Sequence, residues 1–329
     1  MPNEAKRQTE ILPGTAEAIA RGAAILRAGG LVAMPTETVY GLAGDATSER
    51  AVASIYAAKE RPVFNPLIAH VLDVEAAGAE AVLDAHALAL ARAFWPGPLT
   101  LVAPASSACR ISQLARAGLA SVALRAPSHA VARALIEAAG APLVAPSANR
   151  SGRVSPTTAA HVLEDLDGRI DLILDAGPTQ VGLESTIVAC LGGAPRLLRY
   201  GAIAKEAIEA ALGFTIGGQG SEEGEAPLAP GLLASHYAPR ASMRLEAREA
   251  APFEAALDFG GALQASAAGA RLDLSPTSDL IEAAANLFAH LRALDGAGFS
   301  VIAVATIPTH GLGAAINDRL RRAAAPRGS

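Results

Sequence analysis

The chain has 329 residues, of which 51% are hydrophobic and 18% are charged, so we expect a globular protein rather than a disordered one. Its 27 basic and 32 acidic residues give a formal net charge of −5, which argues against tight binding of bulk nucleic acid by charge alone. Its two cysteines are too few for a disulfide framework or a four-thiolate zinc site. The sequence has neither a signal-peptide pattern nor an apolar window that could span a bilayer, so we expect a cytoplasmic protein with no membrane partner.

The first elements are a helix, a strand and a second helix. Apolar residues at helical spacing predict a helix over 15–26, which Gly29-Gly30 ends. A short apolar run over 31–34 predicts a buried strand. Ser48 is suited to cap a second helix over 49–59.

Further short apolar runs predict more strands, with helical patterns between several of them. These runs lie at 67–71, 99–103, 122–124, 143–145, 170–174 and 186–191. Strands that alternate with helices predict an α/β domain. Adjacent strands without a helix near 186–200 predict a mixed rather than a purely parallel sheet.

The composition changes after Leu212, which predicts a domain boundary. The next stretch is rich in glycine and proline and is kept solvated by acidic residues, which is typical of a linker. We therefore expect a first domain over 1–212, a linker over 213–240 and a smaller α/β domain over 241–329. The second domain shows a helix at 277–294, a strand at 301–306 and a last helix near 314–323.

Polar side chains directly follow the first predicted strand. The run 35–42 holds the hydroxyls of Thr36 and Thr38, the carboxylate of Glu37 and the phenol of Tyr40. Ligands of open α/β sheets bind outside the carboxyl ends of strands, so this run is a candidate binding segment. A proline-initiated turn with locally bonded threonines explains the run equally well.

A cationic pair closes the second predicted helix. Lys59 and Arg61 stand before a loop that is stiffened by two prolines, with Asn65 preceding the second of them. Only three of the 27 basic residues are lysines, so a lysine in a motif of this arginine-rich chain is informative. The pair either complements the helix dipole or directs an ammonium and a guanidinium toward phosphates.

A third polar segment, 146–156, follows the predicted strand at 143–145. It contains Ser147, Asn149 and two arginines. We expect Ser155 and Pro156 to open a helix as N-cap and first residue, because these residue types favour those two positions. A helix N-terminus is a natural phosphate site. A long polar loop is the alternative.

Other strands carry similar groups at their ends. Arg125 ends one predicted strand, Ser185 precedes another, and Arg196 and Arg199 lie on a third that cannot bury both. There is no P-loop motif and no nucleophile elbow. Cations and hydroxyls at several strand ends favour binding of a polyphosphate together with a small zwitterion, with catalysis by positioning.

These motifs resemble a known family. Lys59-x-Arg61, Ser147-x-Asn149 and the Pro-Thr-x-Thr-x-Tyr-Gly-Leu run at 35–42 resemble those of the YrdC-like threonylcarbamoyl-adenylate synthases. The resemblance covers about 15–212, and the segment 236–239 with the second domain resembles the long, two-domain form. It implies a YrdC-like mixed, twisted open sheet with helices, plus a smaller C-terminal α/β (Rossmann-like) domain.

The resemblance also implies an activity. Such a nucleotidyltransferase makes threonylcarbamoyl-AMP and pyrophosphate from L-threonine, bicarbonate and ATP with Mg²⁺. Other, downstream proteins pass the threonylcarbamoyl group to an adenosine beside the anticodon of certain tRNAs. The sequence leaves open whether this chain contacts tRNA directly.

By matching position, the resemblance implies a set of site residues. The catalytic cations are Lys59 and Arg61. The implied threonine contacts are Thr36, His70, Arg125 and Ser185. The implied nucleotide contacts are Lys59, Arg61, Asn65, Ser121, Ser147, Asn149, Ser155, Arg199 and Tyr237.

Two other functions share this fold unit. One is an RNA-binding module with a YrdC-like fold, against which the net charge of −5 counts. The other is a carbamoyl-adenylate-forming enzyme, against which the small number of cysteines counts because those enzymes carry zinc-finger-like cysteine clusters.

The linker is expected to act as a lid. The apolar pair Leu232-Leu233 and the group Ser235-His236-Tyr237 are unusual for a passive tether. We therefore expect 213–239 to fold back over the mouth of the site and to place Tyr237 near the nucleotide. Docking of the linker on either domain is the alternative.

Overall fold

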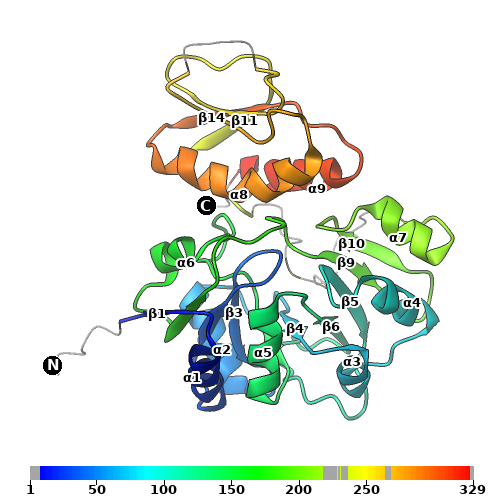
Figure 1. Ribbon diagram of the computed structural model, residues 1–329. Coiled ribbons are helices and arrows are strands. Elements are labelled where there is room, and N and C mark those ends of the chain that lie inside the picture. Colours follow the sequence, from blue (N-terminus) through cyan, green and yellow to red (C-terminus); the bar gives the residue numbers. More distant parts are fainter. Residues whose placement is uncertain (1–7, 218–227, 229, 231–235, 264–267, 327–329) are drawn as a thin grey trace.

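The computed structural model describes residues 8–217, 228, 230, 236–263 and 268–326. Two sheets organise these residues, and each has its own helices (Figure 1). The larger sheet has ten strands and mixes parallel with antiparallel pairs, whereas the smaller has four parallel strands. This confirms the expected fold class, a mixed α/β sheet followed by a smaller α/β unit.

The elements of the larger unit come in the following order. The strands are β1 (Glu10–Pro13), β2 (Val32–Met34), β3 (Gly41–Asp45), β4 (Ile68–His70), β5 (Leu99–Pro104), β6 (Ser121–Arg125), β7 (Leu143–Val144), β8 (Leu172–Asp175), β9 (Thr186–Ala189) and β10 (Arg196–Arg199). The helices are α1 (Ala16–Arg27), α2 (Glu49–Lys59), α3 (Val74–Glu80), α4 (Ala85–Phe94), α5 (Ala130–Ala139), α6 (Ala159–Leu166) and α7 (Lys205–Leu212).

Local sequence explains where the first two helices begin. The hydroxyl of Thr15 accepts a hydrogen bond from the Ala18 amide at the start of α1, and the hydroxyl of Ser48 accepts one from Ala51 at the start of α2. Each caps an amide that has no partner within its own helix. The two predicted helices are confirmed to within a residue at each end.

The strands of the large sheet lie in the order β1-β8-β2-β3-β7-β4-β6-β5-β9-β10. Their inward side chains form the core. β4 and β6 are parallel, and His70 is paired with Arg125 at their carboxyl ends. Strand β7 runs antiparallel to β4 on its other side. The centre of the sheet therefore brings residues from distant parts of the chain to one edge.

The structure corrects the expected start of the helix after β7. Ser155 and Pro156 are not helical, and α6 begins at Ala159 with Thr158 as its cap. The Ser155 hydroxyl instead donates to the Glu184 carboxylate at 2.6 Å. A tertiary partner thus takes the hydroxyl that would have capped a helix.

The smaller unit contains β11 (Ser242–Ala247), β12 (Ala255–Asp258), β13 (Ala270–Asp273), α8 (Leu280–Gly296), β14 (Val301–Ala305) and α9 (Leu312–Ala324). Its strand order is β11-β14-β12-β13. Helices α8 and α9 lie between this small sheet and the larger unit (Figure 1). No helix in the described part of the chain is both long and apolar enough to cross a membrane.

Candidate active site

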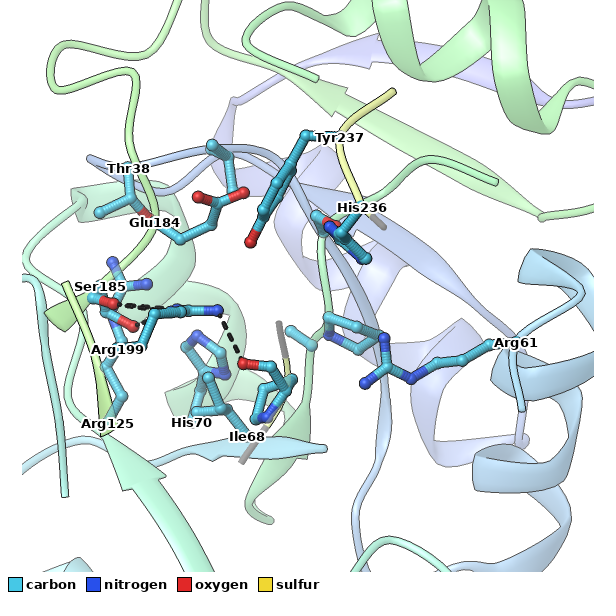
Figure 2. A pocket seen from close by; sticks show the side chains of 15 residues that line it. Thr38, Arg61, Ile68, His70, Arg125, Glu184, Ser185, Arg199, His236 and Tyr237 are labelled. Atoms are coloured by element: carbon cyan, nitrogen blue, oxygen red, sulfur yellow. Dashed lines mark hydrogen bonds between the residues drawn. The ribbon is translucent and has the colours of Figure 1, made fainter. Parts of the chain in front are cut away.

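A cavity of about 50 Å³ lies at the strand ends of the large sheet, beneath the segment that leads into the smaller unit (Figure 2). Its lining combines cations, hydroxyls and apolar groups from both the sheet and that segment. The lining residues are Thr38, Val39, Arg61, Ile68, His70, Arg125, Ala145, Pro146, Ser147, Glu184, Ser185, Arg199, Pro230, His236 and Tyr237.

Arg125 and His70 lie side by side on the floor of the cavity. The Arg125 Nη2 donates to Glu37 Oε1 at 2.7 Å, and both side chains of this pair are buried. Burial alone would raise the pKa of Glu37, but the charge of Arg125 together with hydrogen bonds from Arg125 and from backbone amides outweighs burial and lowers the pKa. Burial, reinforced by Arg125, lowers the pKa of His70 to about 3, so this imidazole is neutral near pH 7.

Arg199 crosses the cavity wall and ties three segments together. Its Nη2 donates to the Ser185 carbonyl at 2.9 Å and to the Ser185 hydroxyl at 3.2 Å, and its Nη1 donates to the Pro230 carbonyl at 3.2 Å. The Ser185 hydroxyl also shares a hydrogen bond of 2.7 Å with Thr100. The other arginine of β10, Arg196, is exposed, as the sequence required of one of the two.

Lys59 and Arg61 are both buried. The Lys59 ammonium donates to the carbonyl oxygens of Ser147 and Asn149, each at 2.5 Å. Burial, and then the charge of Arg61, lowers the pKa of Lys59 well below its usual value. Burial likewise lowers the pKa of Arg61 to about 10. The two cations therefore stand in one desolvated region, although only Arg61 lines the cavity.

Buried polar atoms without a partner gather at this site. Eight such side-chain atoms occur among the described residues, and five belong to the cavity lining or to residues that the sequence assigned to the site. These five are Asn65 Oδ1, His70 Nδ1, Arg125 Nε, Asn149 Oδ1 and His236 Nδ1. Because an unpaired buried polar atom is costly, a concentration of them indicates a place where a ligand supplies the partners.

Part of the expected lid lies over the cavity. Pro230, His236 and Tyr237 line it, and the Ala238 amide donates to the Gly152 carbonyl at 2.8 Å. The Tyr237 ring is buried and stacks on Phe288 of α8 with ring centroids 5.6 Å apart. The linker residues Leu232, Leu233 and Ser235, to which the sequence drew attention, fall outside the described residues.

Six residues that the sequence assigned to the site do not line the cavity: Lys59 and Asn149, described above, and Thr36, Asn65, Ser121 and Ser155. The Thr36 hydroxyl donates to the Val39 carbonyl at 2.6 Å within its own turn, and Thr38 lines the cavity instead. Ser155 is paired with Glu184. The Asn65 side chain is buried. Ser121 and Arg125 are the first and last residues of β6, so Ser121 is about 13 Å from Arg125 at a rise of 3.3 Å per residue.

Sequence reasoning assigned no role to Glu184, although it lines the cavity. Burial alone would raise its pKa, but nearby arginines, Arg319 first and then Arg199, hold the pKa below its usual value. The residues next to Glu184 in the sequence do not indicate a role for it, because the groups that bind its carboxylate, Ser155 and Arg319, are distant in sequence. Glu37 and His236 were likewise noted only as members of their runs.

The donor set does not form a dedicated metal site. Within the described residues, no three acidic, histidine or cysteine side chains cluster as metal ligands would. The two carboxylates near the cavity, Glu37 and Glu184, are each engaged by an arginine. Mg²⁺ keeps several waters and commonly binds through substrate phosphates, so these residues fit an ion that enters with a nucleotide rather than a resident one.

Two protein-family models match the chain. The model for Sua5, YciO and YrdC proteins, described as "Telomere recombination", matches residues 24–201. A model described as the C-terminal domain of threonylcarbamoyl-AMP synthase matches residues 203–325.

Similar proteins match over nearly the whole chain. The threonylcarbamoyl-AMP synthase of Bacillus subtilis is 40% identical and covers 94% of this chain and 93% of its own length. The enzyme of the same name from Pyrococcus abyssi is 39% identical, with 93% of each chain covered. The crystal structure of P. abyssi Sua5 with L-threonine superposes with a TM-score of 0.86 at 36% identity and covers 96% of this chain and 97% of that one.

Proposed function

The chain belongs to the family of two-domain threonylcarbamoyl-AMP synthases, the nucleotidyltransferases of N6-threonylcarbamoyladenosine formation in tRNA, and we propose that the cavity described above is where it performs this reaction. The observation that carries the assignment is the group of cations and unpaired buried polar atoms around one cavity. The substrates are L-threonine, bicarbonate and ATP, with Mg²⁺ bound to the ATP phosphates. We place the reaction in the cytoplasm, with domains over 1–212 and 241–329 and the linker between them.

The reaction has two steps that balance without an oxidant. The threonine amine adds to carbon dioxide, or to bicarbonate with loss of water, and forms a carbamate. A carbamate oxygen then attacks the α-phosphorus of ATP, the bond to the bridging oxygen breaks, and pyrophosphate leaves. The attacking oxygen is already an anion, so the protein's work is to position groups and stabilise charge.

The residues divide between the two substrates. Arg125 is suited to hold the threonine carboxylate, because Glu37 fixes its Nη2 and leaves its Nε without a partner. Neutral His70 presents an unpaired Nδ1 for the threonine side-chain hydroxyl. Ser185, with Thr38 or Thr36 from the loop after β2, completes this half.

Cations serve the nucleotide half. Arg61 and Arg199 reach the cavity and neutralise phosphate charge, while Lys59 orders the loop that carries Ser147 and Asn149. Tyr237 closes the nucleotide from above. Asn65, Ser121 and Ser155 belong to the same proposal as contacts of the outer part of the nucleotide.

A product assay tests the function. The protein is incubated with labelled threonine, bicarbonate, ATP and Mg²⁺, and we expect an adenylate that contains threonine together with one pyrophosphate per adenylate. Omission of bicarbonate should abolish both products. Arg125→Ala should lose the product at low threonine, whereas Arg92→Ala, on the exposed side of α4, should not. Pyrophosphate release that does not depend on threonine would contradict the assignment.

A further inference from the structure

A buried arginine of the smaller unit extends into the wall of the active-site cavity. Arg319 lies on α9, and none of its side chain is exposed. Its Nε donates to Glu184 Oε2 at 2.9 Å, and its Nη2 donates to the Tyr200 carbonyl at 2.8 Å. Its Nη1 donates to the neighbouring Asp318 carboxylate at 2.6 Å. Each nitrogen of the guanidinium thus has a partner.

The same guanidinium lies over the lid tyrosine. Its central carbon is 5.1 Å from the centre of the Tyr237 ring, which is within the range of a cation–π contact. The Tyr237 ring also stacks on Phe288 of α8. One side chain of the smaller unit therefore contacts both a carboxylate of the cavity wall and the aromatic ring above it.

Such an arginine is expensive to bury. Moving a guanidinium out of water is strongly unfavourable, and only good pairing offsets that cost. Burial opposes the charge of Arg319, but Tyr237, Glu184 and Asp318 outweigh burial and raise its pKa, so the residue is a cation in the folded protein. An apolar side chain at this position would let α9 pack without the cost of burying a charge. The presence of a charged residue here therefore needs an explanation.

The partner of Arg319 explains it. Glu184 lines the cavity, its other oxygen accepts from Ser155, and its neighbour in sequence is Ser185. A carboxylate without this partner would repel the phosphates of ATP and would hold the Ser155 hydroxyl less firmly. An ion pair with Arg319 cancels the charge and sets the orientation of the carboxylate.

We propose that Arg319 is a positioning residue of the adenylation reaction, through which α9 neutralises Glu184 and holds Tyr237 for nucleotide binding. The proposal rests on the function assigned above. It makes the nucleotide half of the cavity complete only when the smaller unit is docked on the larger one. Threonine binding depends on Arg125 and His70, so Arg319 should not affect it.

Steady-state kinetics of the full-length protein test this. We expect Arg319→Gln to raise the KM for ATP roughly 10- to 100-fold, the usual effect of losing a charge-assisted hydrogen bond, while the KM for threonine changes less than about threefold. The double variant Arg319→Gln with Glu184→Gln removes the negative charge as well and should recover most of the ATP affinity. Arg319→Lys keeps the charge and should fall between them.

Two control variants separate positioning from docking or folding. Arg292→Gln breaks a different ion pair between the two units, Arg292–Asp165, and should leave the ratio of the two KM values unchanged. Arg321→Gln lies on the exposed face of α9 and should match the unsubstituted protein. Calorimetric titration of a non-hydrolysable ATP analogue gives the same comparison without turnover.

The outcomes are distinct. Equal loss of affinity for ATP and threonine in Arg319→Gln, or a change like that of Arg292→Gln, would overturn the positioning role. A double variant no better than Arg319→Gln would overturn charge neutralisation as its cause. An unsubstituted protein that makes no threonine-containing adenylate would instead reject the proposed function, and the calorimetric comparison would still report on Arg319.

Discussion

Lys59 and Asn149, which are 90 residues apart in the chain, are joined by a buried hydrogen bond of 2.5 Å from the Lys59 ammonium to the Asn149 carbonyl oxygen. The same ammonium also donates to the Ser147 carbonyl oxygen, so two of its three N–H groups are bonded to the backbone of the neighbouring loop. The charge of Lys59 is therefore held in a fixed position. Replacing Lys59 would disturb the loop that carries Ser147 and Asn149 as well as the electric field at the ligand.

We predict that Lys59→Met lowers the rate of adenylate formation about 10²- to 10³-fold, as loss of one charge contact to a transition state typically does. It should also destabilise the fold, because each carbonyl left without a donor costs about 1–3 kcal/mol. Pyrophosphate release and urea unfolding measure the two effects. Lys205→Met, at a partly exposed i,i+4 pair, is the matched control. Arg61→Ala should lose a similar factor in rate, and an ordinary rate in either site variant would contradict the assignment.

Threonine affinity should depend on the buried pair Arg125–Glu37. We predict that Arg125→Ala weakens threonine binding by at least about tenfold, because a bidentate grip on the carboxylate is lost. Glu37→Gln keeps the shape but releases Arg125, so it should have a smaller effect in the same direction. Isothermal titration of threonine checks both, and an unchanged affinity in Arg125→Ala would place the carboxylate elsewhere.

The lid should respond to ligand. The cavity of about 50 Å³ is smaller than ATP and threonine together, so we expect the residues around Tyr237 to move when both substrates bind. We predict that ATP with threonine slows amide exchange at Ala238, whose amide is bonded to Gly152. Exchange at Ile19 in α1 is the internal reference. Equal exchange at Ala238 with and without ligands would reduce the segment to a tether.

Acid should destabilise the protein partly through His70. Its pKa is lowered to about 3 in the folded state, so the unfolded chain binds a proton between about pH 6.5 and 3 that the folded protein does not. Stability therefore falls as the pH falls through this window, by up to about 1.4 kcal/mol per pH unit for this one group. His70→Asn should flatten the slope by about that amount between pH 6 and 4, measured by urea unfolding. His86, a partly exposed histidine of α4, provides the comparison variant His86→Asn.

The seam between the two units depends on Asp165. Its fully buried carboxylate accepts from Arg153 at 2.8 Å and from Arg292 of α8 at 2.6 Å. We predict that Asp165→Ala costs about 3–5 kcal/mol, because it removes the only fully buried carboxylate that pairs with Arg292 among the described residues. Glu164→Ala removes an exposed partner of the same Arg292 and should cost less than about 1 kcal/mol. Calorimetric unfolding of the two variants, compared side by side, checks this.

Local patterns were enough to predict the elements whose signals are local. The capped helices α1 and α2 and the apolar strands β4, β5 and β6 are confirmed by the structure. Strand β3 was not predicted, because Gly41–Asp45 contains no β-branched residue and becomes a strand only by pairing with β2 and β7.

The same distinction between local and distant interactions applies to the site. Arg125 and Arg199 could be predicted as candidates because the ends of neighbouring strands meet at one edge, and both line the cavity. The expected cap at Ser155 was wrong because Glu184, 29 residues further on, binds its hydroxyl. Arg319 could not have been found, since it is 135 residues from Glu184 and no local pattern distinguishes it from other helical arginines.

Strand β1 is synthesised long before the strand with which it pairs. Strand β1 is at the edge of the large sheet and pairs only with β8 among the described strands, and the Thr9 hydroxyl beside it bonds the Ile170 carbonyl across 161 residues. At typical ribosome speeds the amino-terminal segment waits roughly 10–30 s for that partner to emerge. The first strand to be synthesised therefore joins the sheet only after β8 has emerged, when β9 and β10 alone among the described strands of the large sheet are still to follow.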